Sequence, residues 1–125
     1  MNYVFFGNNV PLAERLRKAL GTGVIECITL LQMKNTLLPA EEMDYCVFIE
    51  KTDPTLNIPA IMHLHKMFQN IYIVLIAPEM TREEKISYLQ AGTDCVISES
   101  TSKEDLVKLL GIAEKCKRME KRSEE

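Results

Sequence analysis

The sequence contains no apolar run of the roughly 18 residues that a membrane-spanning helix needs. Its first residues, 1–4, have neither the basic region nor the long apolar segment of a secretory signal. There is also no internal repeat and no low-complexity segment. We therefore expect no membrane contact and a location in the cytoplasm.

The four cysteines include no C-x-x-C pair, and their spacing is not that of zinc ligands. Three of them lie inside apolar segments, where a thiol behaves as a small hydrophobe: Cys27, Cys46 and Cys95. His63 and His65 are two residues apart on an expected helix, so they occupy different faces and do not share a metal. These patterns predict reduced, buried thiols and neither a metal centre nor another cofactor.

Neither sign of charge dominates the 125 residues, which include 15 Lys or Arg and 18 Asp or Glu for a net charge of −3. This balance gives no general attraction to nucleic acid. The hydrophobic fraction of 46% and the charged fraction of 26% are typical of a globular protein, and the length fits one domain. Residues 114–125 interleave basic and acidic side chains, so we expect a solvated helix face there rather than a nucleic-acid site.

Short apolar segments alternate with helical patterns five times along the chain. The expected strands are continuously apolar: Tyr3–Phe6, Val24–Ile28, Tyr45–Ile49, Ile71–Ile76 and Asp94–Ile97. Continuous apolar segments are typical of parallel strands that helices cover on both faces. The alternation therefore predicts an open α/β sheet with right-handed crossover connections.

Prolines, glycines and capping boxes mark the ends of five expected helices. The expected limits are Pro11 to Gly21 or Gly23, Leu30 to Leu38, a start near Pro59, Thr81 to Gly92, and a start near Thr101. One domain is expected over 1–113. Residues 114–125 would then form a charged extension of the last helix that links the domain to an output domain.

Three segments follow one another in a recognisable order: Phe6–Pro11, Asp44–Glu50 and Tyr88–Ser98. They resemble the first strand and its loop, the third strand, and the fourth-helix end with the fifth strand of the receiver domain of bacterial response regulators. The resemblance extends over nearly the whole chain. It implies a (βα)5 flavodoxin-like fold, in which a doubly wound parallel sheet has five strands in the order 2-1-3-4-5.

The resemblance also locates the phosphoacceptor pocket of that family, where the reactive groups are replaced. Glu50 stands at the position of the aspartate that accepts the phosphoryl group. The family's acidic pair, which binds Mg²⁺ through anionic oxygens, aligns with Asn8 and Asn9. Neutral amides at these positions imply that the affinity for Mg²⁺ is lost.

Further replacements fall on the fourth and fifth strands. The family's hydroxyl-bearing residue at the end of the fourth strand aligns with Ile76, and the small residue after it aligns with Ala77. The family's lysine after the fifth strand aligns with Glu99, which reverses the charge, and the switching aromatic aligns with Val96. The resemblance thus implies a degenerate member, a pseudo-receiver that is not phosphorylated.

From these features we expect a regulatory, protein-interaction domain of a bacterial signalling protein, with no enzymatic activity. It would bind a protein partner or a second copy of itself, and neither nucleic acid nor a membrane. The resemblance implies an interface on the fourth helix, fifth strand and fifth helix. Its candidate residues are Arg82, Lys85, Tyr88, Glu99 and Lys108.

Two alternatives remain open at the level of the sequence. One is a flavodoxin-like domain that binds a small molecule at the loops after the strands. The chain has no Gly-rich or Ser/Thr-rich phosphate loop there, which argues against nucleotides and flavin. The other is a receiver that keeps a phosphoacceptor or a cation at a non-standard residue, such as a cation between Glu50 and Glu99 with help from Asn8.

Overall fold

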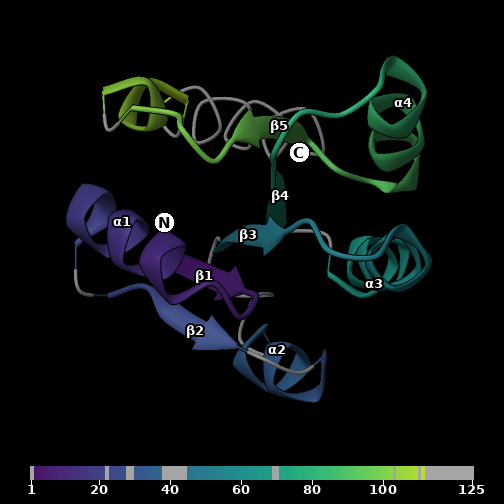
Figure 1. The fold of residues 1–125 in the computed structure, drawn as a ribbon. Coiled ribbons are helices and arrows are strands. Elements are labelled where there is room, and N and C mark those ends of the chain that lie inside the picture. Colours follow the sequence, from purple (N-terminus) through teal and green to yellow (C-terminus); the bar gives the residue numbers. More distant parts are fainter. Residues whose placement is uncertain are drawn as a thin grey trace, which may run out of the picture.

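Five parallel strands form one sheet in the order β2-β1-β3-β4-β5 (Figure 1). The computed structural model describes residues 2–21, 23–27, 30–37, 45–68, 71–102, 104–109 and 111. The strands are β1 (Asn2–Phe6), β2 (Ile25–Cys27), β3 (Tyr45–Glu50), β4 (Ile71–Ala77) and β5 (Cys95–Ser98). The predicted flavodoxin-like sheet and its strand order are confirmed.

Helices lie on both sides of this sheet (Figure 1). They are α1 (Val10–Leu20), α2 (Leu30–Leu37), α3 (Pro54–Met67) and α4 (Arg82–Ala91), and residues 104–109 are also helical. The expected extension over 114–125 lies outside the described residues. In the described part of the chain no helix is both long and apolar enough to cross a bilayer.

The two faces of the sheet carry two separate cores. Helices α2, α3 and α4 cover one face with buried side chains that include Leu37, Leu64 and Tyr88. Helix α1 and the 104–109 segment cover the other face, where Leu16 and Leu106 are buried. Strands β3 and β4 contribute side chains to both cores, as their continuous apolar sequence predicts.

The cysteines lie within or beside this apolar interior. Cys27 and Cys46 are buried and Cys95 is partly buried, all as thiols. Burial raises the pKa of the Cys46 and Cys95 thiols, which keeps them protonated and unreactive. The fourth cysteine, Cys116, lies outside the described residues.

The predicted start of the third helix near Pro59 is wrong. Helix α3 begins at Pro54, and the side chain of Asp53 accepts the backbone N–H of Thr55 at 3.0 Å to cap it. Pro59 lies inside the helix. An interior proline costs about 3 kcal/mol, but burial of Ile61 and Leu64 contributes about 2 kcal/mol each, so the helix continues through it.

The predicted cap of the last helix is wrong by one residue. Ser102, rather than Thr101, accepts the backbone N–H of Asp105 with its side chain, at 3.2 Å. The predicted cap of α4 is confirmed, because the Thr81 hydroxyl accepts the backbone N–H of Glu84 at 3.2 Å. The end of α4 at Gly92 is also as predicted.

Gly92 should be difficult to replace. Its φ is +125°, and a Cβ built on it would lie 2.7 Å from Cγ of His65. We expect Gly92→Ala to lower the free energy of unfolding by about 2 kcal/mol, because both the backbone and this contact become strained. Chemical denaturation measures the change.

Gly23 provides the matched control. A Cβ at Gly23 would meet nothing within 4 Å. We expect Gly23→Ala to be neutral or to stabilise the fold by about 0.5 kcal/mol, because alanine restricts the unfolded chain. Equal stabilities of the two variants would contradict the role assigned to Gly92.

Candidate functional site

The candidate site lies where the parallel strands end, at the edge of the sheet that binds ligands in open α/β folds. Glu50 is the last residue of β3, and it pairs in register with Ile76 of β4. Ile76 pairs in turn with Ile97 of β5. The topology therefore brings the predicted pocket residues of three strands and the β1–α1 loop to one edge.

The carboxylate of Glu50 is held by the β1–α1 loop. Its Oε2 accepts the backbone N–H of Asn9 at 3.0 Å. A Cβ on Gly7 would lie only 2.7 Å from Cβ of Glu50, so the loop can approach this closely because residue 7 is a glycine. Glu50 thus fixes the loop that would carry the metal-binding acids of a receiver.

The two asparagines have different roles. The side-chain oxygen of Asn9 accepts the backbone N–H of Leu12 at 3.1 Å and caps α1. Its side chain is therefore directed into the helix end rather than toward Glu50. The side chain of Asn8 is exposed. Asn9 is thus occupied as a helix cap, while Asn8 lines a cavity together with Glu50.

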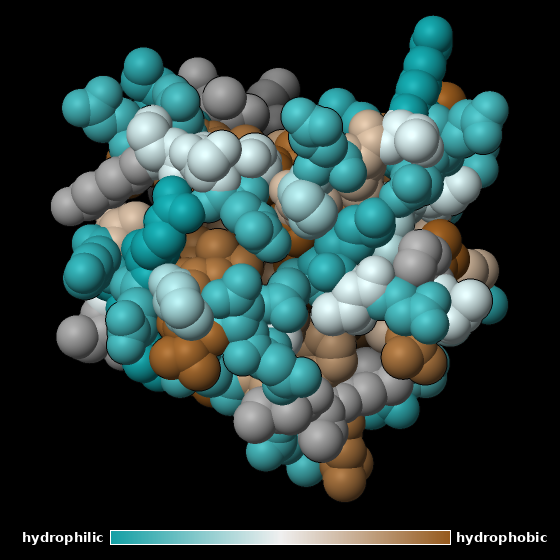
Figure 2. All heavy atoms as spheres, in the orientation of Figure 1, coloured by the Kyte–Doolittle hydropathy of each residue, from teal (hydrophilic) through white to brown (hydrophobic). Residues whose placement is uncertain are grey.

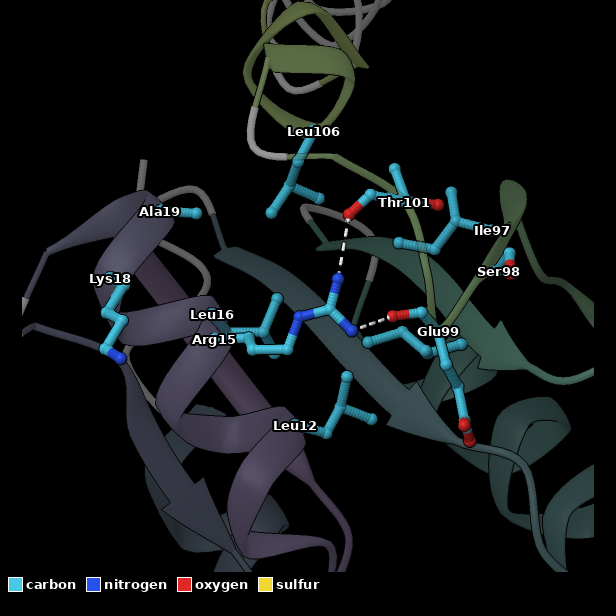
Figure 3. Close-up of a pocket in the computed structure, with 11 residues that line it drawn as sticks. Leu12, Arg15, Leu16, Lys18, Ala19, Ile97, Ser98, Glu99, Thr101 and Leu106 are labelled. Carbon is cyan, nitrogen blue, oxygen red and sulfur yellow. Dashed lines mark hydrogen bonds between the residues drawn. The ribbon is translucent and has the colours of Figure 1, made fainter.

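The β4 and β5 positions of the predicted pocket also point in different directions. Ile76 is buried against the α1 side of the sheet, whereas Ala77 and Val96 pack on the α3 and α4 side. The carboxylate of Glu99 points away from Arg15 (Figure 3). Glu99 lines a cavity beside α1, whereas Glu50 lines another between the β1–α1 loop and the start of α3.

Arg15 of α1 is an important residue that the sequence did not reveal. Its guanidinium donates hydrogen bonds to the backbone oxygens of Glu99 and Thr101, the latter at 3.3 Å (Figure 3). Beside it lies a cavity of about 200 Å³ whose apolar lining includes Leu16 and Leu106. Apolar atoms are visible between hydrophilic side chains on the side of the molecule where α1 lies (Figure 2). Arg15 therefore fixes the loop after β5 from across this groove.

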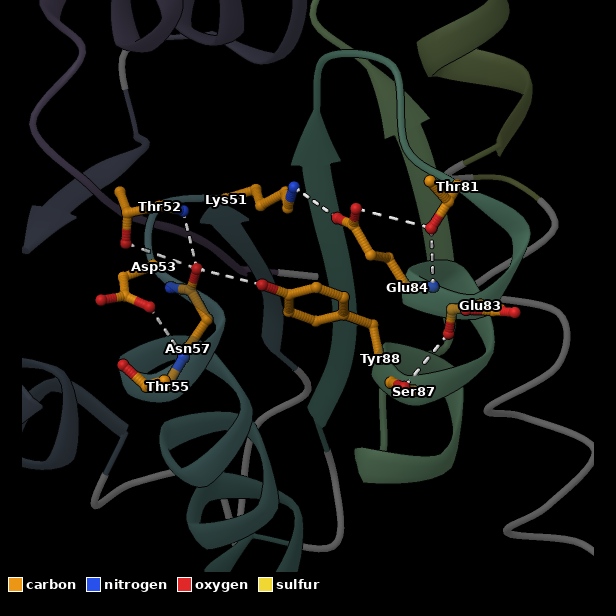
Figure 4. Close-up of polar contacts among 10 residues, drawn as sticks. All are labelled: Lys51, Thr52, Asp53, Thr55, Asn57, Thr81, Glu83, Glu84, Ser87 and Tyr88. Atoms are coloured by element: carbon orange, nitrogen blue, oxygen red, sulfur yellow. Dashed lines mark hydrogen bonds and ion pairs between the residues drawn. The ribbon is translucent and has the colours of Figure 1, made fainter.

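An ion pair joins the residue after Glu50 to α4. The ammonium of Lys51 lies 2.7 Å from Oε2 of Glu84, and the Lys51 side chain is only 16% exposed (Figure 4). The backbone N–H of Lys51 donates to the oxygen of Ile76 at 2.9 Å. The hydrogen bond from Lys51 lowers the pKa of the Glu84 carboxyl. The pair connects the end of β3 to the first turn of α4.

A buried polar cluster lies beneath this ion pair. The side-chain oxygen of Asn57 accepts the backbone N–H of Thr52 at 2.6 Å and the Tyr88 hydroxyl at 3.3 Å (Figure 4). Asn57 is 3% exposed and Tyr88 is fully buried. Burial, together with the charge of Glu84, raises the pKa of Tyr88, so its hydroxyl stays a donor. The cluster joins α3, α4 and the loop after β3.

The expected interaction face included Tyr88, and the burial of Tyr88 in this cluster shows that part of the prediction to be wrong. Tyr88 was expected at the interface, but its ring lies in the core, so it offers no contact surface. Arg82, Lys85 and Lys108 are exposed, and Glu99 is partly exposed. Two apolar residues on the outer side of α4 were not among the candidates: Ile86, which is 44% exposed, and Leu89, which is 42% exposed.

The residues that the sequence did not reveal, Lys51, Asn57 and Arg15, all make their contacts with residues far away in the sequence. Lys51 directly follows Glu50, but only the tertiary structure shows that its partner is Glu84 of α4. Asn57 and Arg15 lie within helices, where a polar residue is ordinarily solvated. A buried asparagine facing a tyrosine of another helix leaves no signal in a single sequence.

No protein-family model matches the chain, and no curated protein sequence matches it. Solved structures do share its fold. A CheY-like protein (TadZ) of Pseudomonas aeruginosa PAO1 has 16% sequence identity and a TM-score of 0.74, with 88% of this chain and 96% of that chain covered. A CheY-like response regulator receiver domain protein of Methanospirillum hungatei JF-1 has 14% identity and a TM-score of 0.76, with coverage of 95% and 97%.

A third similar structure is described as a pilus assembly-related protein of Burkholderia pseudomallei K96243. It has 17% identity and a TM-score of 0.74, with 90% of this chain and 88% of that chain covered. At these identities the likeness establishes a CheY-like flavodoxin fold for the chain.

The Lys51–Glu84 pair predicts a pH-dependent coupling. The folded state lowers the pKa of Glu84 from its usual 4.5, so the pair stabilises the fold above that pH and loses its effect as the pH falls through the lowered pKa. We expect a double-mutant cycle of Lys51→Met and Glu84→Gln to give favourable coupling at about pH 7 and none at about pH 2. Urea denaturation of the four proteins measures it.

A second double-mutant cycle, on another ion pair, provides the control. Arg17 and Glu26 form an ion pair whose side chains are 41% and 37% exposed. Solvent screens this pair more, so its coupling at neutral pH should be smaller. A Lys51–Glu84 coupling that persists unchanged in acid would refute the assignment.

Proposed function

We propose that the chain is a receiver-like regulatory domain that is not phosphorylated and that acts by binding a protein partner or a second copy of itself. The observation that carries this proposal is the state of Glu50. At the phosphoacceptor position, the glutamate side chain is one methylene longer than that of aspartate, and its carboxylate already accepts a hydrogen bond from the backbone of Asn9. A carboxylate held in this way stabilises the β1–α1 loop rather than acting as a nucleophile.

The surroundings of Glu50 support the same conclusion. Transfer of a phosphoryl group to a carboxylate needs Mg²⁺ and cationic groups that neutralise the developing charge. Asn9 caps a helix, and Glu99 adds negative charge where the family has a lysine. Lys51, the nearest lysine in the sequence, is paired with Glu84. The proposed domain is accordingly regulatory and has no enzymatic activity of its own.

The proposed domain has one fixed conformation. The family's switch couples a hydroxyl on β4 to an aromatic on β5, but Ile76 and Val96 stand there. The Lys51–Glu84 pair and the Asn57–Tyr88 hydrogen bond attach α4 to the loop after β3 without any phosphate. These contacts favour permanent order of α4 over a phosphate-controlled movement.

The proposed interface comprises α4, β5 and the 104–109 segment. Its exposed apolar residues are Ile86, Leu89 and Val107, the last of which is 52% exposed. Arg82, Lys85 and Lys108 add positive charge, and Glu99 adds negative charge at its edge. Grouped apolar residues on a surface often mark contacts between proteins. The likeness to pilus assembly-related and response regulator proteins makes a cytoplasmic signalling or pilus-assembly complex the first setting to test.

Phosphorylation is the direct test of the proposal. We expect no mass increase after incubation with acetyl phosphate and Mg²⁺, because neither the nucleophile nor its metal ligands are in place. Intact-mass spectrometry measures the result. A gain of one phosphoryl group that disappears in Glu50→Gln would refute the proposal.

The interface has its own test. We expect Ile86→Glu to weaken self-association or partner binding by about tenfold or more, while the melting temperature stays the same, because the residue is exposed on α4. Sedimentation velocity measures self-association, and a pull-down measures binding to a protein partner. Leu31→Glu is the control, since Leu31 of α2 is 68% exposed on another part of the surface. If both variants bind like the unaltered protein, the interface lies elsewhere.

A further inference from the structure

A second cavity lies between the β1–α1 loop and the start of α3. Its volume is about 370 Å³, within the range of small-molecule sites. Its lining is Phe6, Gly7, Asn8, Glu50, Thr52, Leu56, Asn57 and Ala60. No lysine or arginine is among these residues. It shares no lining residue with the groove beside Arg15.

The orientation of the Asn57 amide in this cavity is fixed. Its oxygen must face Thr52, because the group that it meets there is a backbone N–H, which can only donate. The hydroxyls of Thr52 and Tyr88 meet the same oxygen, each at 3.3 Å. The amide nitrogen therefore lies on the side away from Tyr88, as Figure 4 shows.

The nitrogen of Asn57 is a donor with no hydrogen-bond partner among the described residues. It is not an enclosed atom, because Thr93 Oγ1 is the one fully buried side-chain nitrogen or oxygen without a partner in the described part of the chain. Since Asn57 lines the cavity, an acceptor on a ligand there can reach this nitrogen.

Glu50 presents the complementary group to the same cavity. Its Oε2 is bonded to the backbone of Asn9, which leaves the second oxygen as an acceptor. The walls are apolar where Phe6, Leu56 and Ala60 line the cavity, and Leu56 is 69% exposed. The Asn57 donor, the anionic acceptor of Glu50 and an apolar wall with an aromatic ring thus line one space, which Asn8 and Thr52 also border.

We propose that this cavity binds a small, uncharged, planar molecule with a cyclic amide edge, in which a carbonyl lies beside a ring N–H. The carbonyl would accept a hydrogen bond from the Asn57 amide nitrogen, and the ring N–H would donate to the second oxygen of Glu50. The ring would pack against Phe6 and Leu56. Oxopurines and oxopyrimidines without phosphate have this chemistry.

Other classes of ligand fit less well. A phosphate or carboxylate would be repelled by Glu50 and would find no cationic residue in the lining. A simple cation would satisfy Glu50 but would face the donor nitrogen of Asn57 and leave the apolar wall exposed. Only a molecule with both a donor and an acceptor satisfies both side chains.

Titration with hypoxanthine tests the proposal, followed by the backbone and side-chain amide signals in ¹H–¹⁵N NMR spectra. We expect saturable shifts for Phe6, Gly7, Leu56 and the side-chain amide of Asn57. The matched ligand is 1-methylhypoxanthine, which keeps the carbonyl and the imidazole N–H but lacks the ring N–H beside the carbonyl. We expect it to bind about tenfold more weakly or worse.

The matched protein variant is Glu50→Gln. Its side-chain oxygen can still accept the Asn9 N–H, so its amide nitrogen would then face the cavity as a donor. Affinity for hypoxanthine should fall by about tenfold or more, while Glu79→Gln, which removes an exposed carboxylate from the β4–α4 loop, should bind normally. The proposal is overturned if hypoxanthine causes no saturable shifts at these residues, or if 1-methylhypoxanthine or Glu50→Gln binds equally well.

Discussion

Strands β3 and β4 are apolar on both faces, and this constraint determines the arrangement of everything around them. Buried side chains of β3 and β4 belong alternately to the two cores, so helices must cover the sheet on both sides. Because all the paired strands are parallel, the loops that follow them lie at the same edge of the sheet. Glu50, Lys51 and the β1–α1 loop meet there because β1 and β3 are parallel neighbours, and the hydrogen bond from Asn9 to Glu50 then holds the loop.

At that edge, contacts between protein groups connect the loops to neighbouring elements. Glu50 is tied to the backbone of Asn9, Lys51 to Glu84, and Asn57 to Tyr88. Each contact joins a loop to a neighbouring element. Of these residues, Glu50 and Asn9 align with the phosphoacceptor and metal-binding positions of a receiver. The contacts that connect them and their neighbours are the basis of the proposed non-switching domain.

The two cavities lie on opposite sides of the sheet, at the edge where the strands end. The groove beside Arg15 lies on the α1 side, and Arg15 already binds the loop after β5 there. The cavity beside Asn57 lies on the α3 side and is lined by Asn57 and Glu50. A ligand in the second cavity would touch Asn57, which is bonded to Tyr88 of α4. The proposed ligand site and the proposed interface are therefore joined through one buried hydrogen bond.

The sequence by itself determined the alternation of apolar strands and helices, because apolar periodicity is a local property, and its resemblance to receiver domains implied the strand order that the structure confirms. The five strands and the cap of α4 at Thr81 could be predicted from it, whereas the replacement of the family's aspartate by Glu50 stays a prediction. It could not determine that Asn9 would turn into a helix cap or that α3 would continue through Pro59, since these depend on competing local and tertiary contacts. Only the tertiary structure decided that Tyr88 is buried and that Lys51 meets Glu84. The partners in these contacts lie 31 and 33 positions apart in the sequence, and folding alone brings them within hydrogen-bonding distance.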